Sequence, residues 1–332
     1  MTTAPVPPPQ AVLKIASGAR QAKVLIAANE LEVFTALGDG PLSADALRER
    51  TGLHPYGASH FLDALVGLEL LERRPGGYAN APAADRYLVR GRPEYIGGFL
   101  RFLDRVLHPA WDGLADSLRT GRPANTDPYG GLYRDEADRD EFLAAMDTFN
   151  APLGEALAAR DWSQWSSVVD VGGARGNLAA RLVRAHPHLR AGVFDLPEVR
   201  PAFDRHIAGL GHAPVEFTAG DFFADPLPEA DVLLFGHVLH NWPPDKRVQL
   251  LRSAFKALRP GGAVLIYDAL VEAAEPRLPN LLASLNMLVW SAGGLGYSLD
   301  DARAWLAEAG FGPAAAEELG PATTLVIAHK PR

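Results

Sequence analysis

The second half of the chain contains a glycine-rich turn, DVGGARG (residues 170–176), directly after a predicted strand. Glycines in such a turn let the backbone approach a ligand closely, and the helix that follows presents its N-terminus to the same place. The dinucleotide-binding pattern G-x-G-x-x-G is absent, because Ala174 and Asn177 occupy two of its positions. Taken alone, the turn fits either a ligand site or a plain tight connection between strand and helix.

Acidic residues end three further predicted strands. Asp195 lies 19 residues after Gly176, where a carboxylate can accept both hydroxyls of a ribose. In GDFF (220–223), Asp221 could accept from a purine amino group and Phe222 could pack on its face. The fourth motif is LRPGGAVLIYD, in which a helix breaks at Pro260-Gly261-Gly262 and a predicted strand runs to Asp268. Ligands of open parallel sheets bind at the carboxyl ends of the strands, so together these motifs predict a nucleoside site.

A parallel, doubly wound α/β sheet would place these strand ends along one edge. From Ser167 onward, strand-like and helix-like segments alternate, which is typical of this architecture. The predicted strands lie near 167–172, 190–195, 215–220, 231–238, 263–270 and 323–329.

The first third of the chain predicts a winged helix-turn-helix. Helical segments cover residues 11–38, 43–52 and 56–68, and a hairpin turns at Pro75-Gly76-Gly77. The segment PYGASHFLDALVGLELL, where a DNA-reading module concentrates basic residues, has no Lys or Arg. Burial against a second copy of the chain explains it better, and the first helix would otherwise expose Val24, Leu25, Ile26, Leu31 and Val33. A helical connector follows, with a loop at 121–135.

Composition narrows the class of protein. The 332 residues carry a net charge of -8, which argues against general binding to nucleic acid phosphates. No apolar run approaches the roughly 18 residues of a membrane span. The absence of cysteine excludes disulfides, thiolate nucleophiles and cysteine-based zinc sites. We therefore expect a cytoplasmic protein that binds neither nucleic acid nor membrane.

The motifs DVGGARG, FDLPEV, GDFF, HVLHNW and LRPGG, in this order, resemble the S-adenosylmethionine-dependent O-methyltransferases of the caffeic-acid and hydroxyindole type. Within that family the chain is most similar to actinobacterial enzymes that tailor aromatic polyketides, including hydroxynaphthoates. The resemblance covers nearly the whole chain. It implies a winged-helix dimerisation domain (1–95), a helical connector that contributes to the acceptor pocket (96–165) and a Rossmann-like class I methyltransferase domain (166–332).

The resemblance also implies a role for each motif in holding the cofactor, S-adenosylmethionine. The glycine turn would line the methionine part, Asp195 would hold the ribose, and the third strand end would hold the adenine. The residues implied are Asp170, Gly172, Gly173, Gly176, Asp195, Asp221 and Phe222. Ala174 stands where the family usually has a glycine.

The family's general base corresponds to His240. A phenol with a pKa near 10 must lose its proton to attack the methyl group, and a neutral imidazole can accept that proton. Asp268 matches the acid that orients this histidine, whereas His237, three residues earlier, is expected to face elsewhere. Asn241 replaces the more usual aspartate. The second acid that flanks the histidine in plant members has no clear match around Gly293–Ser298.

Two predicted helices would wall the acceptor pocket. Met146 and Phe149 match the helix that closes over cofactor and acceptor in the family, and a later helix carries Asn286, Met287 and Trp290 on one face. Ordinary core packing explains both sets equally well. His186 and His188 flank Pro187 and no H-E-x-x-H motif occurs, so we expect no metal.

These observations predict a homodimeric O-methyltransferase acting on a phenolic hydroxyl of an aromatic polyketide or hydroxynaphthoate. Two alternatives stay open: an enzyme of the same fold with other chemistry, such as decarboxylation or hydroxylation, and a DNA-binding regulator that senses a small ligand. The sequence does not identify the acceptor or the hydroxyl that is methylated.

Overall fold

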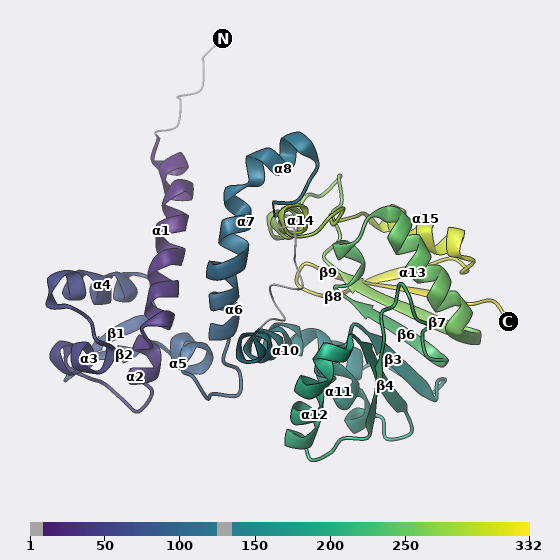
Figure 1. The fold of residues 1–332 in the computed structure, drawn as a ribbon, viewed down its shortest axis with the longest axis horizontal. Helices are drawn as coiled ribbons and strands as arrows, with labels where there is room; N and C mark the ends of the chain where they lie inside the picture. The colour runs from purple at the N-terminus through teal and green to yellow at the C-terminus, as the bar shows by residue number, and fades with distance from the viewer. Residues whose placement is uncertain (1–8, 125–134) are drawn as a thin grey trace, which may run out of the picture. The chain divides into compact units, whose positions relative to one another are not determined.

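The computed structural model describes residues 9–124 and 135–332. The chain forms two compact units, Met1–Asp104 and Arg105–Arg332 (Figure 1). In the described residues, no helix combines the length and apolar character that crossing a bilayer requires. Most of the loop predicted at 121–135 lies outside the described residues.

The first unit is a small helical domain with a two-stranded wing. Its elements are α1 (Gln10–Glu30), α2 (Val33–Ala36), α3 (Ala44–Thr51), α4 (Pro55–Gly67), β1 (Leu71–Arg74), β2 (Gly77–Asn80), α5 (Pro82–Leu88) and α6 (Gly97–Phe102). Ser43 caps α3 by accepting from the Ala46 N–H, and Gly52 ends it in the left-handed region. β1 and β2 pair antiparallel, as a wing requires.

The single helix predicted over 11–38 is two helices, because Glu32 adopts a left-handed backbone conformation with φ of 55°. This break turns Val33 into the unit's own core, where it is fully buried with Phe34. Ile26 is also buried, at 6% exposed, so the expectation that Ile26 and Val33 would need a partner chain for cover was wrong. The exposed apolar side chains of α1 are instead Val12, Leu13 and Ile15.

The second unit begins with short helices, α7 (His108–Asp112) and α8 (Leu114–Thr120), and the long α10 (Glu136–Ala158). A seven-stranded sheet follows, with strand order β5-β4-β3-β6-β7-β9-β8 (Figure 1). Its strands are β3 (Ser167–Val171), β4 (Arg190–Asp195), β5 (Val215–Ala219), β6 (Ala230–Gly236), β7 (Leu258–Asp268), β8 (Ala315–Gly320) and β9 (Thr323–His329). β3 to β7 run parallel, whereas β9 is antiparallel to β7 and to β8.

Helices cover both faces of this sheet. One apolar core joins β-strand residues such as Val168 and Val193 to α10, α11 (Asn177–Ala185) and α12 (Arg200–Gly209). The other joins alternate strand residues such as Val171 and Phe235 to α13 (Pro244–Ala257) and α15 (Leu299–Ala309). α14 (Leu278–Trp290) packs against α7 and α8. The strand order reverses between β3 and β6, and the carboxyl ends of five parallel strands meet at one edge, where ligands of such sheets bind.

Candidate active site

The turn after β3 depends on its glycines. Gly176 caps α11 in the left-handed region with φ of 77°, and a Cβ there would lie 2.6 Å from the Phe203 ring. A Cβ on Gly173 would lie 2.8 Å from the carboxylate of Asp170. Gly172 is also left-handed, with φ of 77°. The turn therefore requires glycine at these positions, and at Gly173 it places backbone without a side chain beside the buried Asp170 carboxylate.

Asp195 joins the end of β4 to this turn. One carboxylate oxygen accepts the Ala174 N–H at 2.8 Å, and the other accepts the Leu196 N–H at 2.7 Å. Burial, together with the nearby Glu198, raises the pKa of Asp195 to about 6 against these two hydrogen bonds. Burial, with Asp195 and Asp147 close by, raises the pKa of Asp170 to about 7. The edge thus concentrates carboxyl groups that a positively charged ligand would stabilise in their ionised form.

The end of β5 brings an acid and an aromatic ring to the same edge. Asp221 is exposed, and its carboxylate accepts the Phe223 N–H at 2.8 Å. The half-buried Phe222 ring meets Phe223 edge-on, with centroids 4.8 Å apart, and meets Trp242 edge-on at 5.8 Å. Phe222 is therefore fixed against the segment that follows β6.

His240 lies on a 3₁₀ turn (Leu239–Asn241) after β6 and is bonded to the end of β7. Its Nδ1 is 2.6 Å from Oδ1 of Asp268, whose side chain is 1% exposed. Burial would raise the pKa of Asp268, but the charge and hydrogen bonds of His240 and His237 outweigh it and hold that pKa well below its usual range. An ionised Asp268 fixes the proton of a neutral His240 on Nδ1 and leaves the Nε2 lone pair to accept another proton.

His237 does not face elsewhere, as the sequence had indicated. Its Nδ1 lies 3.4 Å from Oδ1 of Asp268, and its ring centroid is 5.8 Å from that of His240. The prediction was wrong because β6 ends at Gly236 and His237 is left-handed, with φ of 54°, so the alternation of a strand no longer applies. In the described part of the chain, His237, His240 and Asp268 also bring their donor atoms within 4.8 Å of one another, as metal ligands would.

Family models match most of the chain. The O-methyltransferase domain model covers residues 111–312, and the O-methyltransferase dimerisation domain model covers residues 13–90. The chain belongs to the O-methyltransferase family.

Three of the matching relatives are methyltransferases of Streptomyces species. The tetracenomycin polyketide synthesis 8-O-methyl transferase TcmO of Streptomyces glaucescens is 46% identical over 331 residues, covering 98% of this chain and 97% of that protein. The N,N-dimethyltransferase OxyT of Streptomyces rimosus is 39% identical over the whole of both chains. The 3-hydroxy-5-methyl-1-naphthoate 3-O-methyltransferase of Streptomyces sahachiroi is 35% identical, covering 91% of this chain and 89% of that protein. The predicted resemblance to polyketide-tailoring enzymes is confirmed.

The fold has close counterparts among solved structures. Human N-acetylserotonin methyltransferase, solved in complex with S-adenosylmethionine, superposes with a TM-score of 0.90 at 29% identity over the full length of both chains. The predicted Rossmann-like methyltransferase fold is therefore confirmed, and so is the dependence of this O-methyltransferase on S-adenosylmethionine. The matches favour neither a DNA-binding regulator nor a decarboxylase.

The helix that carries Met146 and Phe149 is tied to the glycine turn of this O-methyltransferase. Arg175 donates from Nε and Nη2 to one oxygen of Asp147 on α10, at 2.8 and 2.5 Å. Met146 is half-buried and Phe149 is 44% exposed, so neither is a plain core residue. This ion pair was not predicted from the sequence, where its only local signal is an arginine inside the glycine-rich turn.

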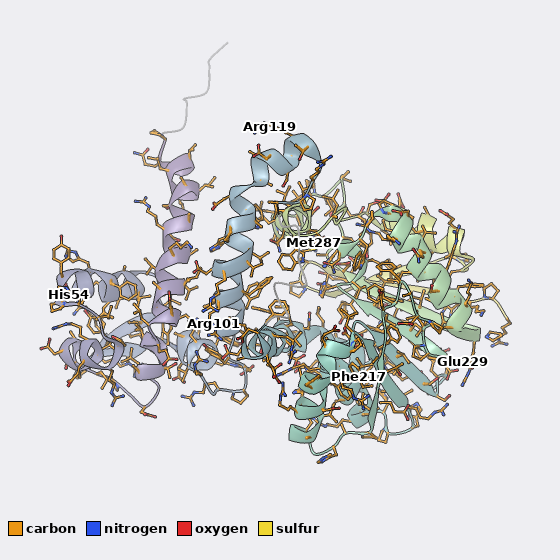
Figure 2. All side chains as sticks on the ribbon, viewed as in Figure 1. His54, Arg101, Arg119, Phe217, Glu229 and Met287 are labelled. Carbon is orange, nitrogen blue, oxygen red and sulfur yellow. The ribbon has the colours of Figure 1, made fainter. Side chains whose placement is uncertain are left out.

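The three predicted residues of α14 have different environments. Met287, which is labelled in Figure 2, is half-buried. Oδ1 of Asn286 accepts the indole N–H of Trp111 on α7 at 2.8 Å, and Trp290 is 5% exposed. Asn286 therefore links α14 to α7, and Trp290 packs mainly in the interior.

Proposed function

We propose that this cytoplasmic enzyme transfers a methyl group from S-adenosylmethionine to a phenolic hydroxyl of an aromatic polyketide or hydroxynaphthoate-type acceptor, with His240 as the general base. The observation that carries the proposal is the His240–Asp268 pair at the sheet edge that also bears the glycine turn and Asp195. The relatives that act on a tetracenomycin intermediate and a hydroxynaphthoate support the acceptor class.

The residues at the sheet edge fit the cofactor in type and arrangement. Asp195 offers carboxylate oxygens for ribose hydroxyls, and Asp221 with Phe222 offers an acceptor and a ring for adenine. We assign the methionine part of the cofactor to Asp170, Gly172, Gly173 and Gly176, because this turn has backbone without side chains next to the Asp170 carboxylate. When bound, S-adenosylmethionine supplies a methyl group on a positively charged sulfur, and the buried carboxyl groups of Asp170 and Asp195 favour that charge.

His240 then acts on the acceptor. Its Nε2 accepts the phenolic proton as the oxygen attacks, and the imidazolium that forms is stabilised by the Asp268 carboxylate 2.6 Å from Nδ1. General-base assistance of this kind contributes about 10²–10⁴ in rate, and holding the two reactants in line contributes further. Met146, Phe149 and Met287 supply apolar surface for a flat aromatic ring, and Asn286 and Trp290 support that wall.

Two copies of the chain form the active enzyme through the dimerisation domain that residues 13–90 match. Val12, Leu13 and Ile15 of α1 are exposed, and they supply apolar surface that this contact between the two copies can bury.

The likeness to OxyT favours a second candidate acceptor, an aromatic amine, because that relative is an N,N-dimethyltransferase. A neutral amine attacks without first losing a proton, so it has less need of His240 than a phenol has.

The test is the mass of the product. The purified enzyme is incubated with S-adenosylmethionine and two panels, hydroxynaphthoates with polycyclic phenols, and the corresponding arylamines. We expect a gain of one methyl group on phenols that lack an amine. Methylation confined to the amines would replace the phenol proposal, and a product of different mass would contradict methyl transfer.

A further inference from the structure

Arg247 on α13 is a buried charge close to the proposed base. The residue is 2% exposed, and within the described residues its guanidinium contacts no carboxylate. Removing a charge from water without a charged partner is costly, so the remaining contacts must hold it in place. Its two hydrogen bonds go to chain segments that adjoin His240.

The guanidinium joins two backbone segments that hold the histidine turn. Nε donates to the carbonyl of Trp242 and Nη2 to the carbonyl of Leu295, both at 2.6 Å. Leu295 in turn donates its N–H to the carbonyl of His240 at 3.0 Å. Arg247 therefore fixes the end of the histidine turn and the segment that is bonded to His240 itself.

The second segment, Ser291–Tyr297, packs directly on the histidine turn. The hydroxyl of Ser291 donates to the carbonyl of Asn241 at 3.0 Å. A Cβ on Gly294 would lie 2.1 Å from that hydroxyl and 3.2 Å from the carbonyl of His240. Close packing of this kind requires glycine and leaves the segment little freedom to shift.

Tyr297 ends this segment and bonds to the acid that orients His240. Its hydroxyl donates to Oδ2 of Asp268 at 3.1 Å, while Oδ1 of the same carboxylate faces His240. Burial, together with the Asp268 charge, raises the pKa of Tyr297 well above its usual value, so the hydroxyl stays a donor. The ring lies beside Arg247, whose guanidinium carbon is 4.8 Å from the centroids of Tyr297 and Trp305.

We propose that Tyr297 is a positioning residue for the base: its hydroxyl fixes the rotation of Asp268, and Arg247 holds Tyr297 and the histidine turn in register. This inference rests on the proposed role of His240. Plant members have a second acid near the positions of Gly293–Ser298, and this chain has no clear match for it. Here the same segment supports His240 through Tyr297, whose hydroxyl binds Asp268, and through the buried Arg247 that packs against Tyr297.

The test is a double-mutant cycle between Tyr297→Phe and Asp268→Asn. Phenylalanine keeps the ring beside Arg247 and removes only the hydroxyl. We expect Tyr297→Phe to lower kcat about tenfold, within the range for a hydrogen bond to a charged group, with KM and the affinity for S-adenosylhomocysteine unchanged. In the Asp268→Asn background the same change should lower kcat by less than about twofold, because the carboxylate that Tyr297 orients is gone. Equal losses in both backgrounds, or an unchanged kcat, would overturn the proposal.

Proton NMR of the imidazole N–H groups gives a readout that needs no acceptor. The Nδ1 proton of His240, assigned by its loss in His240→Gln, should broaden or shift in Tyr297→Phe. An unaltered resonance would count against the proposal. Arg247→Met should lower kcat and broaden the same resonance. The matched control is Arg252→Met, also on α13, where the arginine forms an exposed ion pair with Glu308 of α15; this variant should do neither.

Failure of the two proposals can be told apart. If His240→Ala lowers kcat but Tyr297→Phe does not, only the role of Tyr297 is wrong. If His240→Ala turns over like the parent, the base assignment itself is wrong.

Discussion

Asp195, the last residue of β4, should make the affinity for S-adenosylmethionine depend on pH. The pKa of Asp195 in the unliganded enzyme is raised to about 6 by burial. In its ionised form the carboxylate is the stronger acceptor for the two ribose hydroxyls. Because the protonated acid form of Asp195 accumulates below pH 6, its contribution to affinity should be full above about pH 7 and fall as the pH is lowered through 6.

The size of the effect follows from the fraction ionised. At pH 5, one unit below a pKa of about 6, roughly one carboxyl in eleven is ionised, so the dissociation constant should be about tenfold larger than at pH 7.5. Tenfold corresponds to about 1.4 kcal/mol. Asp170, with a pKa of about 7, would add to the effect in the same direction.

Titration calorimetry with S-adenosylhomocysteine between pH 5 and pH 8, at constant ionic strength, measures this directly. Asp195→Asn is the matched control, since it keeps the shape of the side chain and cannot ionise. The variant should bind more weakly at pH 7.5 and show a smaller loss on acidification than the parent. A parent affinity that stays flat from pH 7.5 to pH 5, or an equal slope in Asp195→Asn, would show that ionisation of Asp195 does not control cofactor binding.

Three substitutions test other parts of the site. Asp268→Asn should keep S-adenosylhomocysteine affinity but lower kcat by about 10²–10⁴-fold. The reason is that the variant loses both the orientation of His240 and the stabilisation of its imidazolium. A kcat near that of the parent would contradict this. Gly176→Ala should lower the free energy of unfolding by about 2–3 kcal/mol in denaturant melts, since φ is 77° and the new Cβ would lie 2.6 Å from Phe203. Ala174 has a left-handed backbone with φ of 49°, so Ala174→Gly relieves strain but raises the conformational entropy of the unfolded chain. Its free energy of unfolding should therefore differ from the parent's by less than about 1 kcal/mol. A loss as large as that of Gly176→Ala would be inconsistent with the turn described.

The placement of the strand-end motifs could be predicted from the sequence, because the geometry of a parallel sheet brings the ends of its strands together. Carboxyl ends of parallel strands share one edge, so Asp195 and Asp268 could be placed at that edge before any coordinates were known. β8 was missed because Ala315–Gly320 is a short edge strand, AAEELG, whose first four residues are exposed and whose sequence lacks β-branched and aromatic residues. The wrong expectation for His237 came from extending β6 past Gly236.

The support around His240 could not be predicted, because it comes from contacts between segments far apart in the chain. Tyr297 meets Asp268 across 29 positions, and Arg247 meets Leu295 across 48. Neither pair follows a spacing rule. Asn286 shows the same limit, since its partner Trp111 lies on α7, 175 residues earlier.

The central claim, that His240 removes the phenolic proton, is tested most directly by the turnover of His240→Ala as a function of pH. At pH 7.5 the variant should bind S-adenosylhomocysteine like the parent and turn over about 10²–10⁴ more slowly. As the pH approaches the phenol pKa near 10, solvent removes the proton and the deficit should shrink steadily. A variant that matches the parent at pH 7.5, or whose deficit does not change with pH, would contradict the claim.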